Sequence, residues 1–130
     1  MNLKRFCIEM GTGIDQHGQD ITGAATKAVK DAVSRICLSG LQEVLKLGSP
    51  NDMIVEVLVA CPNPKEVQTE KVLAALPFGK KKIEVIEGGM RAKVSFAPQL
   101  GDKVDEAVMA NAAVTVFVDM DKVLEAWKKG

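Results

Sequence analysis

The densest group of chemically capable residues lies between residues 11 and 20. This segment, Gly-Thr-Gly-Ile-Asp-Gln-His-Gly-Gln-Asp, holds three glycines, two carboxylates and the only histidine of the 130-residue chain. Asp15 and His17 are two residues apart, so both side chains can point the same way from an extended segment. An imidazole and a carboxylate so placed suit a divalent metal, or an acid or base that works near neutral pH. We therefore predict Asp15 and His17 as catalytic or metal-ligating residues.

The glycines of the segment are expected to form the floor of a small-molecule site. Glycine lets a ligand approach the backbone closely, and a helix that begins near Asp20 offers its N-terminus to an anion, although the Asp20 carboxylate would repel phosphate. A metal would need a third ligand from Glu9, Asp20, Glu87, water or a neighbouring subunit. The predicted ligand-binding residues are Gly11, Thr12, Gly13, Gly18, Asp20 and Glu87.

A structural explanation of the segment stays open. Asp15 and His17 could simply tie down a tight loop whose glycines serve its turn geometry. In that case the chain would be a non-catalytic ligand-sensing or interaction module.

The elements around the segment alternate between strands and helices. Apolar periodicity predicts strands over residues 3–10, 52–61, 82–87 and 107–118, with a shorter pairing segment over 90–96. Helical spacing predicts a helix from Asp20 to a stop at Gly40, a second helix that Asn63 caps and that ends before Pro77, and a short final helix capped by Asp119 or Asp121.

This order predicts an α+β two-layer sandwich over residues 1–130 as a single domain. We expect a mixed sheet with two main helices on one face and a short C-terminal helix, in a ferredoxin-like or chorismate-mutase-like arrangement. The strands over residues 52–61 and 107–118 carry few charges for a solvated second face. We therefore expect a homo-oligomer, with a trimer favoured.

Composition excludes several classes of partner. The 17 basic and 17 acidic side chains balance, and only 4% of residues are aromatic, which argues against nucleic acid. No apolar run is long enough for a membrane span, and the N-terminus has no export-signal pattern. Cys7, Cys37 and Cys61 are widely spaced within apolar runs, so we interpret them as buried thiols of a cytoplasmic protein.

The segment from Met10 to Asp20 resembles the N-terminal motif G-x-G-x-D-x-H-G of a family of short bacterial and plant proteins of unknown function. All five fixed positions match, and the likeness extends to Ala-Cys-Pro-Asn-Pro at 60–64, Ala-Ala-Leu-Pro-Phe-Gly at 74–79 and Ala-Asn-Ala-Ala-Val at 110–114. The resemblance implies that Gly11, Gly13, Asp15, His17 and Gly18 belong to a shared site. It implies no particular reaction.

Two further resemblances concern architecture and metal chemistry. The order of strands and helices is similar to that of the Bacillus-type chorismate mutases and their trimeric relatives, which bind small molecules between subunits. The loop is similar to the G-x-D-x-H opening of the methylerythritol cyclodiphosphate synthases, trimers that use Asp and His as metal ligands. Those enzymes add a second histidine that is absent here.

Together these features predict an oligomer that binds a small polar metabolite at the segment from Gly11 to Asp20. A divalent metal is the candidate cofactor, and a metal-assisted hydrolase or lyase is the candidate activity.

Overall fold

Five strands form one mixed sheet in the computed structural model, which describes all residues 1–130. The central strand β5 pairs antiparallel with β1 on one side and with β2 on the other, and β3 runs parallel to β2. The short strand β4 pairs with the beginning of β5. The strands are β1 (Leu3–Asp15), β2 (Met53–Cys61), β3 (Lys80–Glu87), β4 (Met90–Lys93) and β5 (Glu106–Asp119).

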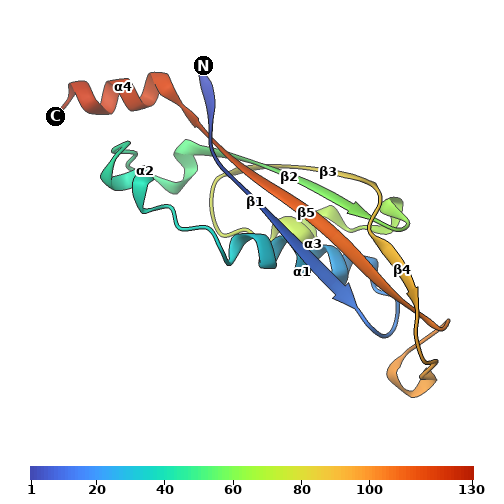
Figure 1. The fold of residues 1–130 in the computed structure, drawn as a ribbon. Helices are drawn as coiled ribbons and strands as arrows, with labels where there is room; N and C mark the ends of the chain where they lie inside the picture. The colour runs from blue at the N-terminus through green and yellow to red at the C-terminus, as the bar shows by residue number, and fades with distance from the viewer.

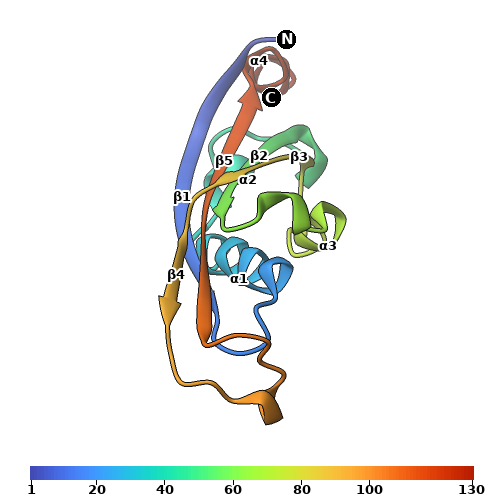
Figure 2. The same ribbon diagram turned by 90° about the vertical axis from the view of Figure 1, so that its right-hand side faces the viewer.

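The helices gather on one side of this sheet. Figure 2 shows α1 and α3 against one face, while the opposite face carries no helix. The α-helices are α1 (Ile21–Val33), α2 (Ser39–Glu43), α3 (Thr69–Leu73) and α4 (Met120–Lys128), and three 3-10 turns are η1 (Pro50–Asp52), η2 (Pro64–Glu66) and η3 (Pro98–Leu100). The predicted α+β class, a mixed sheet with two helices packed on it and a short C-terminal helix, is confirmed.

Capping residues fix where α1 and α4 begin. The Asp20 side chain accepts the Gly23 N–H at 3.0 Å, and the Asp119 side chain accepts the Asp121 N–H at 3.0 Å. These caps satisfy amide groups that a helix leaves unpaired at its first turn. Of the two caps considered for the last helix, Asp119 is the one used. Helix α1 ends at Val33, earlier than the predicted stop at Gly40.

The second predicted helix is divided in two. Asn63 adopts a left-handed φ of 50° and makes no capping hydrogen bond, so Pro64 opens only the 3-10 turn η2. Val67 is extended, and the Gln68 N–H bonds to the Thr22 Oγ1 of α1 at 3.0 Å. A regular helix therefore starts only at Thr69.

Strand β1 is longer than predicted, because it continues through both glycines to Asp15. Gly11 pairs with Ala112 and Gly13 with Ala110 on β5. A Cβ on Gly11 would overlap the backbone oxygen of Ala28 and the nitrogen of Ala32, and one on Gly13 would overlap α1 in the same way. The helix therefore lies directly on the strand backbone, and the predicted end of the strand at residue 10 is wrong.

The core lies between the sheet and its helices and consists of small aliphatic side chains. Valines of β2 and β5 are buried at alternate positions along the strands, and alanines of α1 are buried at helical spacing. The small alanine side chains on the apolar side of α1 allow this close packing. None of the helices is long and apolar enough to cross a membrane.

The second face of the sheet, here called the open face, exposes large apolar side chains. They are Ile8, Met10, Ile14, Leu58, Ile86 and Met90, with exposed fractions between 40% and 67%.

The cysteines differ from one another in burial. Cys61 is buried and Cys7 is half-buried, but Cys37 is exposed, so the prediction of three buried thiols is wrong for Cys37.

Candidate functional site

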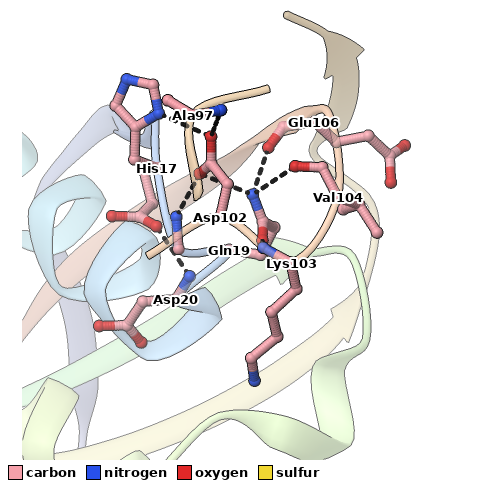
Figure 3. Close-up of polar contacts among 10 residues, drawn as sticks. His17, Gln19, Asp20, Ala97, Asp102, Lys103, Val104 and Glu106 are labelled. Carbon is pink, nitrogen blue, oxygen red and sulfur yellow. Dashed lines mark hydrogen bonds and ion pairs between the residues drawn. The ribbon is translucent and has the colours of Figure 1, made fainter. Parts of the chain in front are cut away.

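The site forms where two loops meet at one end of the sheet. The loop between β1 and α1 carries His17, and the loop between η3 and β5 carries Asp102, 85 residues further along the chain. Antiparallel pairing of β1 with β5 brings these loops together, since the end of β1 lies beside the beginning of β5. The His17 Nδ1 atom lies 3.0 Å from Asp102 Oδ2 (Figure 3).

Asp102 is the centre of the polar contacts. Its side chain is fully buried, and it accepts the backbone N–H groups of Gly18 at 2.8 Å and Ala97 at 2.9 Å. The Gln19 side-chain amide adds a contact at 3.3 Å. The hydrogen bond from His17, together with the donors from Gly18, Ala97 and Gln19, outweighs burial and lowers the pKa of Asp102 to about 2.

An ionised Asp102 determines the protonation of the ring it contacts. A carboxylate only accepts hydrogen bonds, so the Nδ1 atom of His17 carries a hydrogen. The neutral ring then has its lone pair on Nε2. In Figure 3 that second nitrogen points away from Asp102 and from the other labelled groups. A buried carboxylate thus holds His17 in one tautomer and leaves Nε2 as the ring atom that can accept a proton or bind a ligand.

Gln19 fastens the two loops together. It has a left-handed φ of 53°, and its Nε2 donates to the backbone oxygens of Val104 at 3.3 Å and Glu106 at 2.8 Å. Its Oε1 accepts the Lys103 N–H at 3.0 Å. One side chain therefore satisfies three backbone groups of the opposite loop (Figure 3).

His17 borders a pocket of about 440 Å³. The pocket lies beside β4, at the end of the sheet where β1 ends and β5 begins (Figure 1). Most of its wall is apolar, with His17, Gln16 and Ser95 as its polar residues. The apolar residues are Ile14, Met90, Ala92, Val94, Ala107, Val108 and Met109. A concave apolar surface with few polar groups is typical of a small-molecule site.

Asp15 makes a hydrogen bond to the backbone at the start of α1. Asp15 Oδ2 accepts the Asp20 N–H at 2.8 Å, so this carboxylate stabilises the entry into α1. Asp20 itself caps the helix. Nowhere in the chain do three or more His, Cys, Asp or Glu side chains form a group that could hold a metal ion. The predicted metal pair of Asp15 and His17 is not brought together with a third donor.

The other predicted ligand-binding residues are dispersed. Gly11 and Gly13 face α1, whereas Thr12 points to the open face and its N–H bonds to Asp31 at 2.9 Å. Glu87 ends β3 and does not line the His17 pocket. Burial and the nearby Glu87 carboxylate raise the pKa of the Cys61 thiol. Gly18 alone remains in the site, with φ of 89° and its N–H on Asp102.

Sequence reasoning missed Asp102 and Gln19. Asp102 follows Gly101, whose φ of 91° marks a turn, and an Asp after a glycine is common in loops. Nothing local distinguishes it from other loop carboxylates. Its partner is remote in sequence, so only the pairing of β1 with β5 reveals the contact.

Fold and site together define a small α+β protein with a histidine-carboxylate pair at the mouth of an apolar pocket. Residues 5–116 match the family of conserved hypothetical proteins designated the Lin0512 family, and the chain belongs to that family. The matched range includes both His17 and Asp102.

A solved structure gives the same fold. The chain is similar to an FtsZ-like protein of unknown function from Nostoc punctiforme PCC 73102, with 51% sequence identity and a TM-score of 0.83. The match covers 92% of this chain and 98% of that one. No curated protein matches the chain. The family and its solved relative are thus described as proteins of unknown function.

Proposed function

We propose that the protein binds a small molecule in the pocket beside His17 and that the Nε2 atom of His17 exchanges a proton with it. The observation that carries this proposal is the 3.0 Å contact between His17 Nδ1 and the fully buried Asp102. A carboxylate behind an imidazole fixes the ring and stabilises the imidazolium that forms when Nε2 takes up a proton.

The pocket wall indicates the kind of ligand. Ile14, Met90 and Met109 supply apolar contact, while His17 supplies one basic nitrogen. A ligand with an apolar body and one acidic or hydrogen-bonding group fits this distribution better than a fully polar metabolite. Proton abstraction by His17 would then be the first step of a hydrolase or lyase reaction.

A divalent metal is a second use of the same nitrogen. Metal-binding histidines commonly donate their other N–H to a carboxylate, as His17 does to Asp102. Within one chain water or ligand atoms would complete the coordination, because His17 belongs to no group of three or more His, Cys, Asp or Glu side chains.

The competing function is a non-catalytic module in which the loops form only a clasp. The many hydrogen bonds of Asp102 and Gln19 favour that alternative, since both residues satisfy backbone groups of the opposite loop. The two functions differ in whether Nε2 of His17 meets a ligand.

Nitrogen NMR of the single histidine tests the proposal. We expect a hydrogen on Nδ1 and a bare Nε2 in the neutral ring, and we expect phenol or benzoate, as small apolar probes with one acidic group, to shift the Nε2 signal. If neither probe at millimolar concentration moves that signal, the pocket is not a ligand site.

A pocket-filling variant provides the control. Ala92 is exposed on β4 and lines the pocket, so Ala92→Phe fills the space without entering the core. The variant should keep the His17 tautomer and lose the probe-induced shift. Loss of the tautomer together with the shift would instead indicate that the loops had rearranged.

A further inference from the structure

The open face has the size and character of a protein interface. Its six large apolar side chains extend across β1, β2, β3 and β4, and Met10 is the most exposed of them at 67%. With about half of each side chain exposed, the face presents on the order of 500 Å² of apolar surface, the size of the patches that often mark interaction sites. Because interfaces are only about 60% apolar, this corresponds to roughly 800 Å² per partner, the amount a standard interface buries.

The neighbouring edge of the sheet is closed to strand addition. Three side chains at a spacing of four residues, two from α1 and one from the turn after it, occupy free backbone groups of β1. Lys27 Nζ donates to the Ile14 oxygen at 2.9 Å, Asp31 accepts the Thr12 N–H at 2.9 Å, and Arg35 donates to the Met10 oxygen. Such protection prevents another strand from pairing at this edge. Association by strand pairing at this part of β1 is therefore disfavoured, whereas the open face remains available.

The charges on the open face favour a second copy over other partners. Glu56 and Lys82 lie opposite each other on β2 and β3, and Glu84 follows Lys82 on the same face. Both signs occur within one corner, so a polyanion or an anionic surface would meet repulsion as well as attraction. A second copy brings the same alternating charges and can pair them with opposite signs.

We propose that the open face is the interface between copies of this chain, and that the neighbouring copy closes the His17 pocket. Ile14 and Met90 belong both to the open face and to the pocket wall, so a copy seated on the face covers the mouth beside them. The interface is argued from the surface alone. The closure of the pocket by a neighbouring copy rests on the proposed function of the pocket.

Light scattering of the purified chain at micromolar concentration tests the interface. We expect a closed oligomer, with the predicted trimer among the supporting masses. Met10→Glu and Leu58→Glu place a charge at exposed positions of the face and should weaken assembly at least about tenfold. A monomeric wild-type chain, or a Met10→Glu chain that assembles like wild type, would overturn the proposal.

The matched control lies on another surface. Val44 is 60% exposed beside α2, away from the open face, so Val44→Glu should leave the mass unchanged. Equal circular dichroism spectra and melting temperatures of the three variants would show that each is folded. If Val44→Glu dissociates the oligomer as strongly as Met10→Glu, the interface lies elsewhere.

Chemical modification tests the closure of the pocket separately. Diethyl pyrocarbonate reacts with unprotonated imidazole, and His17 is the only histidine. The reaction should be several-fold slower in the wild-type oligomer than in monomeric Met10→Glu. Equal rates in an intact oligomer and its monomeric variant would remove the shared pocket while leaving the interface, and the phenol and benzoate experiment would still judge the pocket itself.

Discussion

The two halves of the glycine-rich segment from Gly11 to Asp20 have different structural roles, although they are continuous in sequence. Gly11 and Gly13 lie in β1 with their Cα atoms against α1, where a Cβ would overlap the helix backbone. His17 and Gly18 lie beyond the end of the strand and contact the buried Asp102. The first half determines how close the helix comes to the sheet, and the second half carries the polar site.

This difference shows that one short motif can combine a packing requirement with a chemical one. The glycines that seemed to form a ligand floor are needed because the helix is too close for any side chain. By fixing α1, they also fix the loop from which His17 reaches Asp102. Substitutions in the two halves should therefore fail in different ways.

The largest effect is expected in the packing half. In Gly13→Ala the new methyl group would meet the backbone of Ala24 and Ala28, which cannot move aside as a flexible side chain can. We expect a loss of about 3 kcal/mol or more in the free energy of unfolding, measured by urea denaturation. Gly48→Ala is the control, since nothing lies within 4 Å of that position. Equal stability of the two variants would contradict the packing role.

Asp102→Asn should be the most damaging change in the polar half. The amide cannot accept from His17, Gly18 and Ala97 as a carboxylate does, so buried donors lose their partner. We expect the melting temperature to fall by about 5 °C and His17 to lose its single tautomer. Calorimetry and nitrogen NMR measure the two effects, and an unchanged tautomer would show that Asp102 does not orient the ring.

Lowering the pH should weaken the contacts of Asp102 before it affects the packing of the β1 glycines against α1. The pKa of Asp102 is about 2 in the folded protein against an ordinary value of 3.8, so its carboxylate stabilises the fold fully above the ordinary value. That contribution is lost as the pH falls from about 4 to about 2. Urea midpoints measured across this range should fall more steeply in wild type than in Asp102→Asn. Parallel curves would contradict the lowered pKa.

Gly18→Ala should lower the free energy of unfolding less than Gly13→Ala does. The added Cβ strains the backbone conformation at Gly18, whereas at Gly13 it overlaps neighbouring atoms. Gly18 has φ of 89°, but the nearest atom to an added Cβ would be the Gly101 oxygen at 3.9 Å. A side chain in this backbone region costs about 1 kcal/mol. Urea denaturation should show that loss. If Gly18→Ala lost as much free energy of unfolding as Gly13→Ala, the space for a side chain would be restricted at both positions.

The smallest effect is expected at Asp15. Asp15→Ala removes one acceptor, that of the Asp20 N–H at 2.8 Å, and should lower the free energy of unfolding by about 0.5 to 1 kcal/mol. His17 should keep its tautomer, because Asp102 still holds it. If Asp15→Ala does change the tautomer, the result would support the pairing of Asp15 with His17 that the sequence predicts.

Much of the fold follows from local patterns in the sequence. The apolar runs over residues 52–61 and 107–118, the apolar residues at helical spacing after Asp20, and the capping aspartates Asp20 and Asp119 each predict an element that the structure contains. The second helix was overestimated because Asn63 and Pro64 open only a 3-10 turn, and the Gln68 N–H that follows bonds to Thr22 of α1.

The sequence by itself singled out His17 and Gly18, because a lone histidine among glycines is visible without any structure. Only the tertiary structure decided that the partner of His17 is Asp102, that Gln19 joins the loops, and that Gly11 and Gly13 serve packing. The physical reason is distance along the chain. Residues 85 apart meet through the register of β1 with β5, and that register depends on the packing of the whole sheet.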